Sequence, residues 1–378
     1  VTKSWMGYQD RFSRRQTGTS ANLDRQEFSF LGVDTRLRHL WEAGNSELAT
    51  TGGVVFYLSD SPRSRKRGAE PNATTGSTRF ELDRRTTYGA FFAEQLVTLG
   101  RLSIIPAFRL EWLGMKVQEL SNTEVSRPLI TDSYTSTVPL GAVGVAYDVG
   151  RAGELYANWS QGYRPKEYDD LANPTSSSQQ APSELDESRT GTYEFGVRGT
   201  PASWWTYDTS YFLIDYDNFI ETLSLSGGNS ERSNSGRAVY QGWEVAGELD
   251  LLGLYDHLAR TEHGKRWGRV SVHGNLSLLD AEFIGGLNDD KDPAYAPAYL
   301  VKTGITYNLE DRVKLSLTGE LVGDHYWQDS NAAGTVGTTT ISAYTVWDLE
   351  LDAKLYKDWV RLIAGVNNVF DKDYYARI

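Results

Sequence analysis

The chain of 378 residues contains no cysteine at all. Disulfide frameworks, thiol catalysis and zinc sites built on cysteine are therefore excluded. No run of about 18 apolar residues occurs either, which excludes a membrane-spanning helix. No stretch rich in proline, in glycine and serine, or in charge of one sign is long enough to be a linker. We therefore expect one domain over residues 1–378, although the length alone would suggest about two or three.

Methionine is scarce, at 2 residues, whereas aromatic residues reach 12% and glycines number 36. This profile favours pleated strands joined by tight turns. The net charge of −12 argues against a nucleic-acid partner. The mean hydropathy of −0.47 is that of a soluble chain, but the strands of a membrane barrel alternate and average out as polar. The first residues already alternate as a strand does, so we expect no signal peptide there.

Apolar and polar residues alternate with a period of two along most of the chain. The alternation is clearest in residues 270–278, 313–321 and 347–355. In the last of these segments, four charged residues from Asp348 to Lys354 share one face. A soluble sheet also has one wet face, but such a long charged face suits a watery or plugged lumen better.

The alternation predicts about fifteen strands. Their centres are expected near Tyr8, Gly32, Val55, Ala90, Ala107, Val143, Tyr156, Phe195, Phe212, Val245, Gly274, Gly304, Thr318, Leu349 and Gly365. Short turns are expected at 44–45, 100, 150–153, 201–202, 310–311 and 357–358, and long loops at 13–24, 61–79, 120–133, 164–187, 227–235, 285–296 and 328–339. Short turns that alternate with long loops are typical of an antiparallel up-and-down barrel in the outer membrane. The longer stretch 256–266 breaks this rule.

Large aromatic side chains gather near the predicted strand ends. They include Trp41, Trp112, Trp204, Trp205, Trp267, Trp327 and Trp359. Such positions favour the aromatic girdles of a membrane barrel; ordinary turn-proximal aromatics are the alternative interpretation.

Five segments resemble TonB-dependent outer-membrane receptors, and they follow one another in that family's order. They are residues 155–165, 183–198, 234–244, 293–299 and 365–375. The sharpest is the last, G-V-N-N-V-F-D-K-D-Y-Y, which marks the penultimate strand in that family. Within the family, residues 102–111 and 212–215 are similar to ferric citrate receptors.

The resemblance implies a barrel of 22 strands closed by an N-terminal plug. We expect this chain to be a fragment that lacks the plug, the first strands and the last strand, with a gap in the barrel wall. The implied function is active import of a scarce ferric chelate across the outer membrane of a Gram-negative cell, driven through the TonB complex, which contacts the plug. Outer-membrane lipid and lipopolysaccharide are the other implied partners. No enzymatic activity and no cofactor are expected.

No catalytic or metal-ligating pattern stands out. The five histidines are scattered without H-E-x-x-H spacing, and His273 is expected to face the lumen. Residues 288–292 resemble the opening of a calcium loop, but Pro293 replaces the required glycine, so a solvated loop is the better interpretation. Residues 160–162 form only half of a nucleophile elbow, because Asn158 stands where the first glycine should be.

One basic run stands out in this acidic chain, in the predicted loop 61–79. The candidate ligand-binding residues are Arg63, Arg65, Arg67, Arg79, Arg84 and Arg85, followed by Arg164 and Lys166 in a later loop. Guanidinium groups bind carboxylates through paired hydrogen bonds, so a polycarboxylate iron chelate is a reasonable ligand. Contact with lipopolysaccharide phosphates and simple solvation are the alternatives, since charge runs usually mean exposure.

Two other functions stay open on the sequence alone. A passive diffusion porin would share the barrel pattern but have no coupling to TonB. A secreted all-β binding or enzymatic domain would share the strands but would be soluble without detergent.

Overall fold

The computed structural model describes residues 1–44, 46–175, 185–224, 230–234, 236–310, 312–333, 337–356 and 359–376. Several predicted connections lie partly or wholly outside these ranges. They are the turns at Asn45, Asp311 and 357–358, and parts of the loops 164–187, 227–235 and 328–339. Ser183, Glu184 and Ser235 of the motifs lie outside as well.

The described chain is nearly all strand. The strands are β1 Thr2–Thr17, β2 Ser20–Ala43, β3 Ser46–Asp60, β4 Arg63–Gly68, β5 Ser77–Leu99, β6 Leu102–Asn122, β7 Thr131–Asp148, β8 Glu154–Arg164, β9 Ser188–Ala202, β10 Trp205–Asp217, β11 Ile220–Ser224, β12 Ser230–Asn234, β13 Arg237–Asp250, β14 Arg269–Ile284, β15 Tyr299–Leu309, β16 Val313–Val322, β17 His325–Tyr326, β18 Thr340–Ile341, β19 Tyr344–Tyr356 and β20 Val360–Val366. The helices are η1 Gly150–Ala152, α1 Tyr168–Leu171, α2 Leu251–Ala259 and α3 Gly264–Trp267. Among the described residues, no helix is long and apolar enough to cross a membrane.

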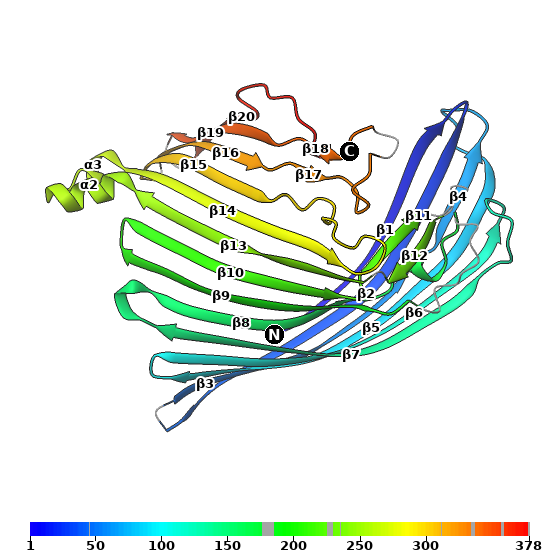
Figure 1. Cartoon of the computed structure of the whole chain (residues 1–378), viewed down its shortest axis with the longest axis horizontal. Coiled ribbons are helices and arrows are strands. Elements are labelled where there is room, and N and C mark those ends of the chain that lie inside the picture. The colour runs from blue at the N-terminus through cyan, green and yellow to red at the C-terminus, as the bar shows by residue number, and fades with distance from the viewer. Residues whose placement is uncertain are drawn as a thin grey trace. The chain divides into compact units, whose positions relative to one another are not determined.

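Sixteen strands form one sheet, and fifteen of them follow one another in sequence order from β1 to β20 (Figure 1). Neighbouring strands run antiparallel wherever the register is defined, as in β1–β2 and β13–β14. All fifteen predicted strand centres fall inside these fifteen strands. The prediction of an antiparallel up-and-down barrel fold is therefore confirmed.

Several predicted connections were wrong in detail. The expected long loop 13–24 is strand almost throughout, because β1 and β2 pair up to a tight turn at Gly18, whose φ of 61° suits glycine. Residues 201–202 belong to β9, and the turn follows them. The basic run of loop 61–79 forms β4, which pairs with β2 on one side and β5 on the other. The stretch 256–266 lies within a helical turn formed by α2 and α3.

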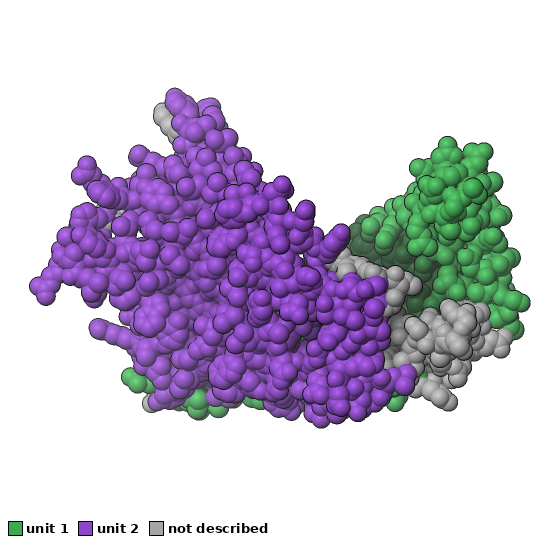
Figure 2. Space-filling model, turned by 45° about the horizontal axis from the view of Figure 1, so that its top comes forward, with its two compact units in different colours: residues 1–143, 160–190, 218–235 green, residues 144–159, 191–217, 236–378 purple. Residues whose placement is uncertain are grey.

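The chain divides into two compact units, coloured separately in Figure 2. Unit 1 comprises residues 1–143, 160–190 and 218–235, and unit 2 comprises residues 144–159, 191–217 and 236–378.

In unit 2, paired residues form rows across the strands that differ sharply in polarity. One row is apolar throughout: Trp205, Leu249, Val272, Ile305, Leu317, Leu349 and Val366. The adjacent row on the opposite face is Thr206, Glu248, His273, Gly304, Thr318 and Asp348. Large side chains of the apolar row are exposed, for example Ile305 at 43%. We call the face with the apolar row the outer face and the opposite one the inner face.

Unit 1 shows the same two-sidedness. Phe56 and Trp112 lie on its outer face, each paired with Gly89 of β5, and both are exposed. Asp34 and Glu111 lie on the inner face. Exposed apolar side chains on one face and charged ones on the other are the arrangement of a membrane barrel wall.

The inner face of unit 1 also carries a small apolar core. Leu113, Met115 and Val117 of β6 pack against Leu171 and Ala172, which belong to the end of α1 and the residue after it. The chain that follows β8 thus folds back onto the inner face of its own unit.

The predicted aromatic girdle can be compared with the positions of the tryptophans. Trp41 and Trp205 lie in strands beside the short turns, and Trp267 lies in α3 at the short-turn end. Trp112 lies further from its turn, within β6. Trp327 lies outside the strands of the main sheet, where its indole Nε1 donates to Thr338 O at 2.7 Å.

Candidate functional site: an arginine cluster on the inner face

The basic run forms strand β4, and the geometry of this strand sets the directions of its side chains. Side chains two residues apart in a strand share a face, so Arg63, Arg65 and Arg67 point to one side and Ser64 and Lys66 to the other. The first side is the inner face, because Arg65 pairs in register with Asp24 of β2 and with Phe80 of β5. All three arginines are partly buried. The expectation that a charge run is merely solvated does not describe these three side chains.

Each of the three arginines has a specific partner. The guanidinium of Arg65 donates through Nε to Asp24 Oδ1 at 2.9 Å. Arg63 reaches Asp169 Oδ1, in α1, at 3.4 Å, and Arg67 donates to Asn22 Oδ1 at 3.1 Å. Carboxylate and amide oxygens thus hold the three guanidinium groups on the inner face.

The ring of Phe80 packs against the guanidinium groups of two of these arginines. The guanidinium carbons of Arg63 and Arg65 lie 5.5 and 5.1 Å from its centroid, and Phe80 itself is fully buried. Cation–π contact of this kind fixes a guanidinium while leaving its edge donors free to bind an anion.

Arg79 extends the group along β5. Its Nε lies 4.0 Å from Glu124 Oε2, and Arg65 lies at the same distance from the other oxygen of Glu124. Neither distance is a hydrogen bond, and the buried Nε of Arg79 has no hydrogen-bond partner. One carboxylate is therefore shared loosely between two guanidinium groups.

Arg84 is the most deeply buried of the candidate residues, at 6% exposure. Its Nε donates to Ser61 O at 3.0 Å, and its guanidinium stacks 4.9 Å from the ring of Tyr168. Its Nη2 has no hydrogen-bond partner. Burial, and then the nearby charge of Arg63, lower the pKa of Arg84, although an arginine stays charged.

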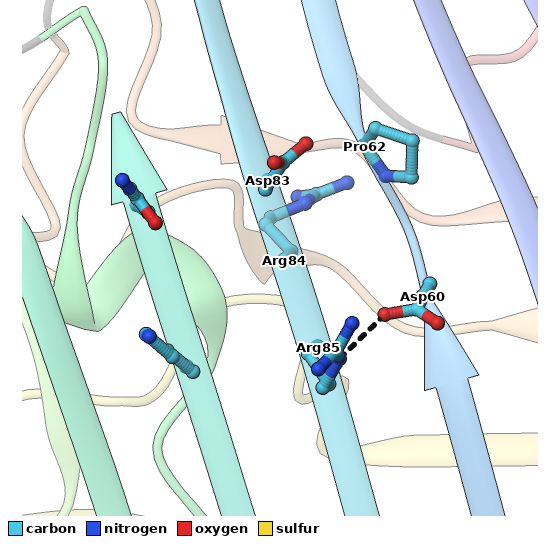
Figure 3. A pocket seen from close by; sticks show the side chains of 7 residues that line it. Asp60, Pro62, Asp83, Arg84 and Arg85 are labelled. Atoms are coloured by element: carbon cyan, nitrogen blue, oxygen red, sulfur yellow. Dashed lines mark hydrogen bonds and ion pairs between the residues drawn. The ribbon is translucent and has the colours of Figure 1, made fainter. Parts of the chain in front are cut away.

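Two cavities border this group. One, of about 320 Å³, lies where β3 ends and the chain passes to β4 (Figure 3). Of its lining residues, Arg84 lies on the inner face, whereas Asp60, Arg85 and Lys116 lie on the outer face. Figure 3 shows the side chain of Arg84 extending toward Pro62.

The other cavity, of about 190 Å³, is lined chiefly by arginine. Its lining residues are Arg11, Ser13, Asp24, Arg25, Gln26, Arg63 and Arg65. Arg11 pairs in register with Gln26 on the inner face, and the sequence interpretation had missed it. Its position in β1 gave no signal in the sequence, because only the strand register brings it beside β4.

We define the arginine cluster as Arg11, Arg63, Arg65, Arg67, Arg79 and Arg84. Among the described residues, three carboxylates lie against these six cations, those of Asp24, Glu124 and Asp169. The cluster therefore carries an excess of positive charge. Unpaired N–H groups on Arg79 and Arg84 add donors that an anion would satisfy.

The remaining candidate residues do not join this cluster. Arg85 follows Arg84 in β5 and so points to the outer face, where its Nε donates to Asp60 Oδ1 at 2.7 Å (Figure 3). Arg164 pairs with Glu167 at 3.3 Å. Lys166 lies 5.0 Å from the ring centroid of Tyr134. Arg85 therefore lies on the opposite face of β5 from Arg84, and a role for it in ligand binding stays a prediction.

A buried ion pair holds the loop that surrounds the cluster. Glu119 and Arg127 join β6 to the loop before β7 through two hydrogen bonds of 2.7 and 2.8 Å, and both side chains are essentially inaccessible. Arg127 also donates to Asn173 O at 3.0 Å, which ties the chain beyond α1 to the same point. Burial alone would raise the pKa of Glu119, but hydrogen bonds from Arg127, Ile130 and Asn122 lower it below 4.5.

The residues considered for other chemistry have ordinary structural partners. His273 lies on the inner face, between Glu248 and Gly304 in its row. In the calcium-like loop, Lys291 Nζ donates to Asn288 Oδ1 at 3.0 Å. Among the described residues, no group of three or more histidine, aspartate or glutamate side chains is placed to hold a metal ion.

Comparison with known proteins identifies the family to which this chain belongs. A family model described as the β-barrel of TonB-dependent receptor-like proteins matches residues 2–369. The chain belongs to this family. TonB-dependent receptor barrels lie in the outer membrane of Gram-negative bacteria, and the family consists of transport receptors rather than enzymes.

Solved structures agree on the fold. The chain is similar to the unliganded ferric citrate transporter FecA, with 16% identity and a TM-score of 0.79, covering 99% of this chain and 54% of that one. For the copper transporter OprC the values are 18%, 0.74, 99% and 57%. For the ferric yersiniabactin receptor FyuA of Yersinia pestis they are 17%, 0.70, 100% and 54%. The chain thus spans about half the length of these receptors.

Proposed function

We propose that this chain forms part of the barrel of an outer-membrane receptor that takes up a ferric chelate bearing carboxylates, such as ferric citrate, with energy supplied through TonB. The observation that carries the proposal is the arginine cluster on the inner face. Its cations outnumber the carboxylates against them, and buried N–H groups of Arg79 and Arg84 lack partners.

The chemistry of the cluster favours carboxylate over a neutral ligand. Guanidinium forks match the two oxygens of a carboxylate, and a charge-assisted hydrogen bond is about twice as strong as a neutral one. Arg63 and Arg65 are already held by Phe80 and by one carboxylate each, so little side-chain freedom is lost on binding.

Family membership favours the receptor over a passive porin. The names of the similar structures, which concern ferric citrate, ferric yersiniabactin and copper, support a metal-bearing ligand. We further propose that the whole protein carries a plug in addition to residues 1–378, and that the plug contributes the contact with TonB.

Growth on single iron sources tests the proposal. A strain without its own ferric citrate receptor, supplied with the gene for the full-length protein, is grown on ferric citrate, on ferric catecholate and hydroxamate siderophores, and on no added chelate. We expect growth on ferric citrate or another polycarboxylate chelate. Growth on none of the carboxylate-bearing chelates would overturn the ligand class.

Replacing Arg63, Arg65 and Arg67 by serine tests the site itself. We expect uptake at limiting chelate to fall about 10- to 100-fold, because each charged hydrogen bond lost is worth roughly 1.5–3 kcal/mol. The matched control replaces Arg85 and Lys116 by serine, since this pair lies on the outer face of β5 and β6. Equal uptake by the triple variant and the control would exclude β4 from the binding site.

A further inference from the structure

One connection on the short-turn side is much longer than the other described turns there. The other described turns on that side are short, as between β5 and β6 or β7 and β8, whereas β13 ends at Asp250 and β14 begins only at Arg269. Helices α2 and α3 fill this interval. Asp250 is the N-cap of α2 and accepts a hydrogen bond from Gly253 N at 3.1 Å. The sequence therefore specifies where this helix begins.

Helix α2 is amphipathic, and its apolar side faces away from the protein. Leu251, Tyr255 and Leu258 have the i, i+4, i+7 spacing that places side chains on one side of a helix. Their exposures are 39%, 54% and 74%. A surface helix of a water-soluble protein turns its apolar side inward, toward the core.

The polar side of α2 makes the contacts with the rest of unit 2. A side chain at Gly253 would meet Trp204 Cβ at 2.9 Å, so the helix backbone lies close against the β9–β10 turn. The ring of His257 lies 5.7 Å from that of Trp204. Asp256 accepts from Thr261 Oγ1 at 2.7 Å and from His263 N at 2.9 Å. These contacts fix the helix with its apolar side outward.

The apolar side of α2 continues the lipid-facing wall. Leu249, two residues before Leu251, belongs to the apolar row of the outer face, together with its neighbours Trp205 and Val272. It is the last outer-face position of β13 before the helix. Trp267 of α3 is exposed at 57%, and tryptophan and tyrosine are the residues that membrane interfaces favour.

We propose that α2 and α3 form an interfacial anchor, which lies in the headgroup region of the periplasmic leaflet with Leu251, Tyr255 and Leu258 inserted toward the acyl chains. The occupant of this surface is phospholipid rather than protein, because the surface begins two residues after Leu249, the last membrane-facing residue of β13. The exposed cation Arg266 lies at the level of lipid phosphates. Interfacial helices combine an apolar side with such cations.

Residues 1–378 contain no cysteine, so a cysteine introduced in this part of the protein is its only thiol once any cysteine elsewhere in the full-length protein has been replaced by serine. The variants Leu258→Cys and Tyr255→Cys of the full-length protein each accept one environment-sensitive thiol fluorophore. Arg260→Cys, on the opposite side of the helix end, and Arg151→Cys, in the short turn before β8, are the matched controls. The labelled proteins are reconstituted in phosphatidylethanolamine–phosphatidylglycerol vesicles, and heat-modifiable migration on gels verifies that each has folded.

Lipids brominated near the headgroup should quench the labels at 255 and 258 about fivefold more than those at 260 and 151, and aqueous iodide should show the reverse order. Equal iodide quenching at all four positions would overturn the anchor. Labels at 255 and 258 that are shielded from iodide yet untouched by brominated lipid would also overturn it, and would indicate a protein on this surface.

Discussion

At the scale of single residues, Arg84 is the least ordinary group in the structure. A guanidinium at 6% exposure usually has a carboxylate partner, whereas Arg84 has a backbone carbonyl and an aromatic ring. The adjacent Arg85 is exposed and paired with Asp60. Neighbouring residues of the same type thus occupy opposite faces and opposite environments.

This contrast gives a matched pair of substitutions. Arg84→Met removes the unpaired donor while keeping much of the packing volume, and we expect the Kd for the chelate to rise about 10- to 100-fold. Arg85→Met should leave the Kd unchanged, because its side chain lies on the other face. Binding titrations on the purified full-length receptor measure both. A larger effect for Arg85→Met than for Arg84→Met would place the ligand elsewhere.

The buried pair of Glu119 and Arg127 predicts a dependence on pH. The pKa of Glu119 is lowered in the folded protein, so its stabilisation is complete above the usual pKa of 4.5 and is lost as pH falls through the lower, folded value. We expect the amide of Ile130, which donates to Glu119 at 2.8 Å, to lose exchange protection in that acidic range. Hydrogen exchange, corrected for intrinsic rates, measures this loss.

The neutral variant Glu119→Gln provides the control for that experiment. Its protection should be lower than that of the wild type at neutral pH, since Arg127 would then be buried without its carboxylate partner, at a penalty of roughly 3–5 kcal/mol. It should also change little on acidification. A wild-type Ile130 amide that kept full protection at every acidic pH at which the protein stays folded would contradict the assignment.

At the scale of elements, the strand positions could be predicted and their faces could not all be assigned. Alternation placed all fifteen strands of the main path because lipid and water impose opposite demands on their two faces. Strand β4 was missed because neither of its faces is apolar. Its spacing of arginines at 63, 65 and 67 was nevertheless a strand signal, and it would have separated these residues from Lys66.

The contacts of the site depend on features that one sequence does not display. The β4–β5 register shifts between Arg65 and Lys66, and such a bulge has no reliable local signature. The arrival of Arg11 and Asp169 beside β4 depends on long-range pairing and on a loop that folds back. Individual charges were therefore predictable, and the group that they form was not.

The two faces of β13 allow a sharp test at this scale. Val245 lies on the outer face at 46% exposure, and the next residue, Ala246, lies in the inner row with Asp208 and Asn275. We expect Val245→Arg to destabilise the barrel by about 2–4 kcal/mol, as for an arginine facing lipid, and Ala246→Arg to have a much smaller effect. Denaturant titration in lipid vesicles measures both. Equal losses would refute the assigned sidedness.

At the scale of the whole molecule, the family match covers residues 2–369, and the chain resembles about half of each solved receptor. The functions to compare are therefore those of a receptor and of a pore. Coupling to TonB is the property that separates such a receptor from a pore. We expect uptake through the full-length protein to cease in a strain that lacks TonB or after the proton-motive force is collapsed. Transport of radiolabelled ferric chelate measures it. Uptake that persisted in the strain without TonB would favour the porin.

The length of β2 has a bearing on how a solute first meets this protein. Its 24 residues extend over roughly 80 Å at about 3.3 Å per residue, well beyond a hydrocarbon layer of about 30 Å. The tight turn at Gly18 caps the far end of this ribbon. A solute that approaches along this hairpin from the medium therefore meets polypeptide before it reaches the lipid surface.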